Sequence, residues 1–127
     1  MSRLTIKLPR PFDLGVTVTS YGYGRLAPNH WDGDTHTLTT RLAIAGDTED
    51  VRIRQRGDSL RLTTNRRLDR RQQVRVRQAV TRMLRLDENL GPWFDHNPDA
   101  RRRSFGRLIR SATLFEDMVK TITSCNV

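Results

Sequence analysis

Several features are scarce or missing in this 127-residue sequence, and each absence narrows the class of protein. Cys125 is the single cysteine, so no internal disulfide can form, a usage that fits a reducing compartment. The three histidines and Cys125 lack the spacing of a zinc site, and we predict neither a metal nor a cofactor. No apolar run is long enough to span a bilayer or to act as a signal peptide, which predicts a soluble, cytoplasmic protein without a membrane partner.

Sequence motifs for catalysis are missing as well. The chain contains no G-x-S-x-G, no Walker-type phosphate loop and no H-E-x-x-H. Gly22 and Gly24 lack the third glycine, the preceding strand and the following helix of a dinucleotide-binding turn. Lys120 falls on the polar side of a predicted helix, where a solvated lysine is a safer interpretation than an amine nucleophile.

Positive charge is abundant, and it is concentrated in one part of the chain. Residues 1–50 carry five basic and six acidic side chains, a net of −1, whereas residues 51–127 carry eighteen and eight, a net of +10. A strongly basic half indicates contact with a polyanion, and nucleic acid is the leading choice. The alternative is that the bias towards arginine, with only Lys7 and Lys120 as lysines, reflects codon composition and solubility.

Alternation of apolar and polar residues predicts four strands. Leu4, Ile6 and Leu8 alternate with polar residues, and Pro9 ends that strand. Residues 35–44, 51–54 and 60–64 follow the same pattern and are separated by short turns, which predicts an antiparallel meander. Its apolar face must be covered by helices, while its other face carries three arginines, namely Arg52, Arg54 and Arg61. The β-branched residues in segment 12–23 also favour a strand there, although Asp13 could cap a helix.

Two amphipathic helices are predicted in the basic half. The first runs over residues 69–86 and is capped by Asp69. Its polar face carries arginines that either face phosphates or are simply solvated. The second begins after Thr113, which forms a capping box with Glu116, and its apolar stripe has no downstream partner in the sequence. We expect that stripe to be exposed or to cause self-association. Trp93 and Phe94, between the two helices, are expected to pack at the junction between elements.

Four stretches occur in the order found in a known family. They are Phe12-Asp-Leu14, Ser20-Tyr-Gly-Tyr-Gly-Arg-Leu-Ala-Pro-Asn-His-Trp-Asp32, Arg82-Met-Leu-Arg-Leu-Asp-Glu88, and residues 106–126 from Gly106 to Asn126. Together they resemble the front part of the helix-hairpin-helix DNA glycosylases of the 3-methyladenine and 8-oxoguanine type. The last stretch is the most specific, although Ala112 stands where the family usually has a proline.

The resemblance implies a fold and a domain organisation. It predicts an α+β domain over residues 1–100, an antiparallel sheet with flanking helices similar to half of a TATA-binding-protein fold. Residues 101–127 would then begin an all-α catalytic domain. It also changes residues 14–21 from strand to helix. In the family, the DNA-gripping hairpin and the catalytic aspartate lie downstream of the position of Asn126, so we expect this chain to be a truncated portion without base excision of its own.

The resemblance also implies site residues and a partner, duplex DNA. Asn126 matches the position that fills the space left by a flipped base, while the alternative is an ordinary asparagine at a helix end. Arg107 and Arg110, in the same stretch, are predicted to contact DNA, and Tyr21 or Tyr23 to line the pocket for the damaged base. The function this implies is that of the N-terminal portion of a base-excision glycosylase. The alternative is a non-catalytic basic module that binds nucleic acid through backbone charge.

Overall fold

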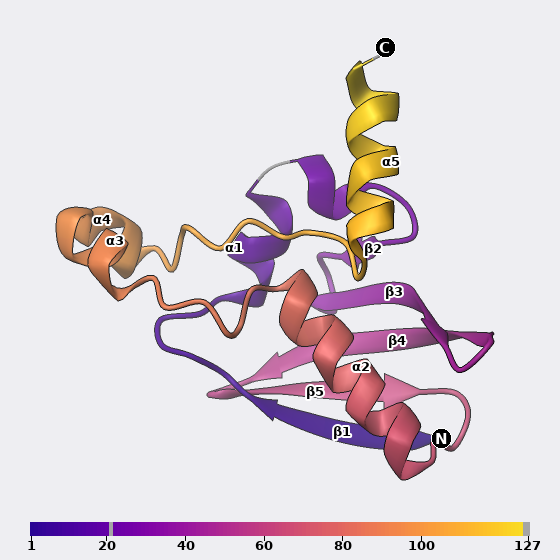
Figure 1. The fold of residues 1–127 in the computed structure, drawn as a ribbon. Helices are drawn as coiled ribbons and strands as arrows, with labels where there is room; N and C mark the ends of the chain where they lie inside the picture. Colours follow the sequence, from indigo (N-terminus) through magenta and orange to yellow (C-terminus); the bar gives the residue numbers. More distant parts are fainter. Residues whose placement is uncertain (21, 126–127) are drawn as a thin grey trace.

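The computed structural model describes residues 1–20 and 22–125, and its centre is a five-stranded antiparallel sheet (Figure 1). The strands lie in the order β1-β5-β4-β3-β2 and comprise β1 (Ser2–Lys7), β2 (His30–Asp32), β3 (Thr37–Ile44), β4 (Asp47–Arg56) and β5 (Ser59–Thr64). The helices are α1 (Leu14–Thr19), the 3₁₀ helix η1 (Gly22–Arg25), α2 (Arg70–Met83), α3 (Gly91–His96), α4 (Pro98–Arg102) and α5 (Leu114–Cys125). The predicted α+β class with an antiparallel sheet is confirmed.

Tight turns set the register of the central strands. Ala45 and Gly46 join β3 to β4 with φ angles of +50° and +85°, the pair of positive values that a type I′ turn requires. Gly57 has a φ of +57° at the first central position of the turn between β4 and β5. The three predicted strands of the meander are therefore confirmed, with β4 longer than expected because pairing with β3 starts at Asp47.

The pleat divides the sheet into two chemically different faces. Alternate residues turn one way into a core that α2 covers, which buries Leu38, Val51, Ile53, Leu60 and Leu62 completely. Each such side chain contributes roughly 1.5–3 kcal/mol to stability through burial. The intervening residues are mainly threonine and arginine and lie on the opposite face, as the sequence predicted for Arg52, Arg54 and Arg61.

Helix α2 is capped at both ends by its own sequence. The Asp69 carboxylate accepts the N–H of Gln72 at 2.8 Å, and the Gln72 side chain accepts the N–H of Asp69 at 2.9 Å. At the other end Arg85 has a φ of +52°, which lets the N–H of Leu86 donate to the carbonyl of Thr81 at 3.0 Å. This is a Schellman motif in which an arginine occupies the position where glycine is usual.

The segment after β1 is helical, so the expectation of a strand from propensity alone was wrong, whereas the helix implied by the resemblance is confirmed as α1. Asp13 caps α1 by accepting the N–H of Val16 at 2.9 Å. Gln55 of β4 then accepts the N–H of Leu14 at 2.8 Å. These fixed contacts outweigh the weak β preference of Val16 and Val18. The short strand β2, with Trp31 against the core, was not foreseen.

Two glycines are required by close packing. A Cβ on Gly24 would lie 2.3 Å from the carbonyl oxygen of Val18, so η1 can pack against α1 only with glycine at that position. Gly106 has a φ of +138°, and a Cβ there would lie 2.6 Å from the Trp93 ring. Trp93 packs edge-on against Phe94, which is buried, and also lies against Phe105, so it joins α3 to the chain after α4.

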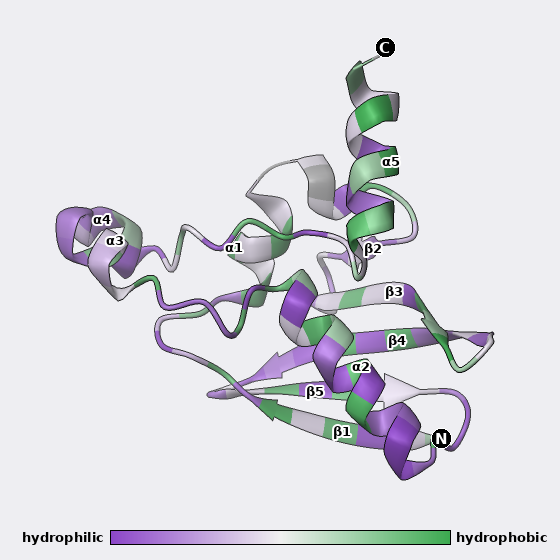
Figure 2. Cartoon of the chain, in the orientation of Figure 1, coloured by the Kyte–Doolittle hydropathy of each residue, from purple (hydrophilic) through white to green (hydrophobic). Residues whose placement is uncertain are grey.

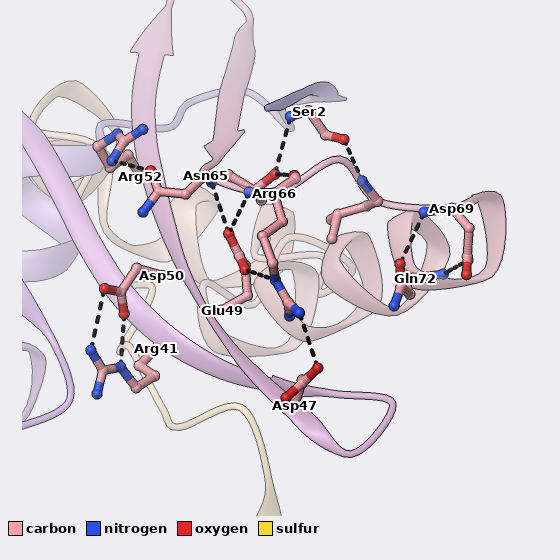
Figure 3. A network of polar contacts seen from close by, with 12 residues as sticks. Ser2, Arg41, Asp47, Glu49, Asp50, Arg52, Asn65, Arg66, Asp69 and Gln72 are labelled. Atoms are coloured by element: carbon pink, nitrogen blue, oxygen red, sulfur yellow. Dashed lines mark hydrogen bonds and ion pairs between the residues drawn. The ribbon is translucent and has the colours of Figure 1, made fainter.

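A polar network fastens the start of β4 to the loop that follows β5 (Figure 3). The Glu49 carboxylate is almost completely buried and accepts the backbone N–H groups of Asn65 and Arg66 at 2.8 and 3.1 Å. It also accepts the Arg66 guanidinium at 2.8 Å, and that guanidinium reaches Asp47 at 3.0 Å. Burial by itself raises the pKa of Glu49, but these hydrogen bonds outweigh it and leave the pKa below its ordinary value.

None of the described helices is both long and apolar enough to cross a membrane.

We predict that Glu49→Gln lowers the free energy of unfolding at pH 7 by about 1–3 kcal/mol, because the Arg66 guanidinium loses a charged acceptor. The folded-state pKa of Glu49 lies below its unfolded value, so its contribution is present at neutral pH and is lost as the pH falls through the folded-state pKa. Urea denaturation of both proteins at pH 7 and pH 3 measures the difference, which should shrink at the lower pH. A difference independent of pH would contradict this role.

Candidate functional site

The structure describes only some of the five predicted site residues. Tyr21 and Asn126 lie outside the described residues, and of Tyr23 only the backbone, within η1, is described. Arg107 and Arg110 lie in the extended segment between α4 and α5. The geometry around these two arginines therefore defines the part of the predicted site that the structure describes.

The segment over residues 107–111 packs against the end of α2. The N–H of Arg110 donates to the carbonyl of Met83 at 2.9 Å, and Ile109 is fully buried in the core beside Gly24. The segment thus passes between η1 and the end of α2 before α5 begins (Figure 1). It joins the sheet domain to α5 through packing as well as through the chain.

Arg107 is buried, with 4% of its surface exposed. Its Nη1 donates to the carbonyl of Arg85 and, at 2.9 Å, to that of Glu88. Burial lowers the pKa of Arg107, against the opposing effect of the Glu88 and Asp87 carboxylates. The guanidinium satisfies carbonyl groups just beyond the Schellman end of α2, so in this structure it stabilises the fold and offers little surface to DNA.

Arg110 is also held against α2, though a quarter of its side chain stays exposed. Its Nε donates to the carbonyl of Arg82 at 2.7 Å, and its Nη1 lies 3.9 Å from Glu88. Conversely, Nε of Arg85 donates to the carbonyl of Leu108 at 2.6 Å. The α2 end and the extended segment thus exchange guanidinium–carbonyl bonds in both directions.

Helix α5 is oriented by an ion pair at its base. The Asp117 carboxylate binds Nη2 of Arg82 at 2.7 Å and accepts the N–H of Ser111 at 2.8 Å. Lys120, one turn further on, donates to the hydroxyl of Ser111 at 2.9 Å. Thr113 caps the helix by accepting the N–H of Glu116 at 3.2 Å, as the sequence predicted. The polar face of α5 is therefore the face that contacts the rest of the chain.

The apolar face of α5 is exposed. Five side chains keep between 43% and 75% of their surface accessible, namely Leu114, Phe115, Met118, Val119 and Ile122. No residue of α5 whose side chain is described is buried, and the helix projects away from the sheet with hydrophobic residues along it (Figure 2). We call these five residues the α5 stripe. Such a contiguous exposed patch marks an interaction surface.

Candidate metal ligands do not gather in the described part of the chain. The described residues contain no group of three or more His, Cys, Asp or Glu side chains that could hold a metal ion. Cys125 is exposed at the end of α5.

The sequence did not predict the structural role of Arg107, because hydrophobicity suggests that Leu108 is buried and Arg107 exposed. Leu108 is 45% exposed while the charged Arg107 beside it is buried. The signal that could have revealed it is the predicted end of a helix near residue 86, whose free carbonyl groups need donors. Only the fold shows that the donor comes from twenty residues further along the chain.

Comparisons with known proteins identify the fold. No family model matches the chain, and no curated protein sequence matches it either. Among solved structures it is similar to a 3-methyladenine DNA-glycosylase from Archaeoglobus fulgidus, with a TM-score of 0.67 and 16% sequence identity. The chain has the fold of the N-terminal part of that glycosylase. The match covers 89% of this chain and 41% of the glycosylase, so this chain spans less than half of the protein it resembles.

We predict that Arg107→Gln destabilises the free protein by about 1–3 kcal/mol, because the carbonyl groups of Arg85 and Glu88 lose their donor. Chemical denaturation without DNA measures this change. Arg75→Gln, which removes an exposed arginine on α2, is the matched control and should leave stability within about 0.5 kcal/mol of the wild type. If Arg107→Gln is as stable as the control, the structural role is excluded and a direct DNA contact is favoured.

Proposed function

We propose that this chain is the N-terminal portion of a base-excision DNA glycosylase, whose complete form hydrolyses the N-glycosidic bond of a damaged base flipped out of duplex DNA. The observation that carries the proposal is the fold match to the N-terminal part of a 3-methyladenine DNA-glycosylase. In this proposal, residues 1–100 are the α+β domain and residues 101–127 lead into an all-α domain.

The α5 stripe supports that organisation. A two-faced helix gains its stability mainly by burying an apolar face, and α5 is fixed to the sheet domain through its polar face instead. Its apolar side chains stay exposed, where further helices would pack. We propose that α5 is the first helix of the catalytic domain and that the helices that follow it cover the α5 stripe.

DNA contacts at the domain junction are part of the same proposal. Asn126 would fill the space left by the flipped base, and Tyr21 or Tyr23 would line the pocket for it. Arg110, partly exposed beside α5, is better placed to reach a phosphate than the buried Arg107. The burial of Arg107 favours an indirect role for it, through the position of α5.

A second function, that of a non-catalytic nucleic-acid-binding module, is favoured by a different observation. The basic half carries a net charge of +10, and several of its arginines share an exposed face of the sheet. Such a module would bind nucleic acid without any helical domain. The two proposals agree on the ligand and differ on the chemistry.

The translation of the natural reading frame beyond residue 127 separates the two functions. The glycosylase proposal predicts a helix-hairpin-helix followed by an aspartate, and predicts that the longer polypeptide releases alkylated bases from duplex DNA. Residues 1–127 alone should release none. A longer polypeptide with that domain but without base release from any damaged duplex would contradict the proposal and leave the binding module.

We also predict that residues 1–127 self-associate through the α5 stripe, since exposed apolar surface is removed from water by pairing. The double variant Phe115→Gln with Met118→Gln should be monomeric in sedimentation at concentrations where the wild type is not. Both side chains are exposed, so thermal unfolding of the sheet domain should be unchanged. A wild type that stays a compact monomer with α5 protected from hydrogen exchange would contradict this prediction.

A further inference from the structure

The sheet face that α2 does not cover is a second surface with a consistent chemistry. We call it the open face, and its basic residues are Arg3, Lys7, Arg41, Arg52, Arg54, Arg56 and Arg61. Two acidic side chains share it, Asp32 and Asp50. The surface is hollowed, with a cavity of about 810 Å³ whose lining includes five of these arginines.

Strand register aligns these groups in rows across the sheet. One row runs through His30, Thr39, Arg52, Thr63 and Arg3, and the next through Asp32, Thr37, Arg54, Arg61 and Thr5. Arginines and threonines alternate in the centre of the first row and flank one another in the second, so hydrogen-bond donors cover the centre of the face. Neighbouring rows are two residues apart along each strand, about 6.7 Å.

The second row places two cations at paired positions. Arg54 lies directly opposite Arg61 on the neighbouring strand, and like charges at such paired positions repel one another. A sheet selected for stability alone has no reason to place two cations there. A bound anion removes the repulsion, which points to a ligand with negative charge.

The acidic residues of the open face do not neutralise its centre. Asp50 is engaged by Arg41 through two hydrogen bonds of 2.8 and 3.3 Å, at the edge of the arginine rows. Asp32 accepts the hydroxyl of Thr35 at 2.8 Å and backbone N–H groups of the same turn, and these bonds lower its pKa. It forms no ion pair with a described residue of the open face.

The central arginines keep their charge available. Nε of Arg54 donates to the Thr37 hydroxyl at 2.8 Å, and Arg52 donates to the amide oxygen of Asn65 at 3.1 Å (Figure 3). These hydrogen-bond partners are neutral. The Asp50 carboxylate also attracts Arg52, but its oxygens are hydrogen-bonded to Arg41. Beyond the backbone ladder, the side chains of Arg3 and Arg61 form no hydrogen bond or ion pair within residues 1–20 and 22–125.

The absence of aromatic side chains indicates the kind of polyanion. None of the described strand residues on the open face is Phe, Tyr or Trp, and Trp31 of β2 packs against the core instead. Proteins that hold single strands rely on aromatic rings that stack on bases. Guanidinium and hydroxyl groups are instead the usual contacts to the phosphates of a duplex.

We propose that the open face binds the phosphate backbone of duplex DNA, separately from the junction at α5. The inference rests on the proposed function for the identity of the polyanion, and it adds a binding surface on the sheet. Such a surface would hold the duplex without reading its sequence. Its affinity would therefore depend strongly on salt.

The test compares two double variants of residues 1–127 with the same change in net charge. Arg3→Gln with Arg61→Gln changes the open face, and Arg71→Gln with Arg75→Gln changes the solvated face of α2. Anisotropy of a labelled duplex, titrated at several salt concentrations, gives the slope of log affinity against log salt. The open-face variant should lose affinity roughly tenfold per guanidinium at 50 mM salt, and its slope should fall by about two units.

The control variant should bind nearly as the wild type does. Equal losses in both variants, or a loss only in the control, would overturn the open face as the site. Tighter binding of a single strand than of a duplex would overturn the choice of ligand. A wild type without duplex binding at low salt would overturn this inference together with DNA binding by this chain, whereas a failure of the longer polypeptide to release bases would leave it standing.

Arg61→Glu separates binding from folding. It places a carboxylate opposite Arg54, so a like-charge pair becomes an ion pair and the melting temperature should stay equal or rise. Duplex affinity should nevertheless fall below that of Arg61→Gln. A variant that is both as stable as the wild type and equally tight in duplex binding would contradict the proposal.

Discussion

The burial of one face of the sheet under α2 is the constraint on which the rest of this structure depends. Period-two alternation gives each strand an apolar side, and α2 covers those sides with Val76, Val80 and Met83. The same pleat sends the arginines and threonines to the open face. The chemistry of that face is thus tied to the packing of the core, because a shift of register by one residue would exchange the two.

The end of α2 is also where the chain turns from the sheet domain towards α5. Its Schellman motif leaves carbonyl groups that Arg107 and Arg110 satisfy, and Arg82 of α2 holds Asp117 of α5. These bonds fix the direction in which α5 leaves the sheet domain. The α5 stripe is therefore presented in a defined orientation, as a helix that begins a second packed unit requires.

The sequence predicts the parts of this fold that depend on local pattern. Alternation located β3, β4 and β5, and Asp69 and Thr113 located two helix starts, because caps and periodicity act within a few residues.

Segment 14–19 could not be assigned from propensity, because Gln55, about forty residues away, contributes to its cap region. The buried position of Arg107 was equally hidden, since its partners are carbonyl groups about twenty residues earlier. The alternating pattern placed Arg52, Arg54 and Arg61 on one face of the sheet. That Arg54 lies opposite Arg61 is known only from the register of β4 and β5.

We propose a sheet domain with two binding surfaces, an apolar one on α5 for further helices and a cationic one on the open face for duplex DNA. Arginine-selective modification, mapped by mass spectrometry with and without duplex DNA, tests the second surface most directly. If the open face binds the duplex, DNA protects Arg3, Arg54 and Arg61 while Arg71 and Arg75 stay reactive. Protection confined to Arg71 and Arg75, with the open face as reactive as in the free protein, would contradict it.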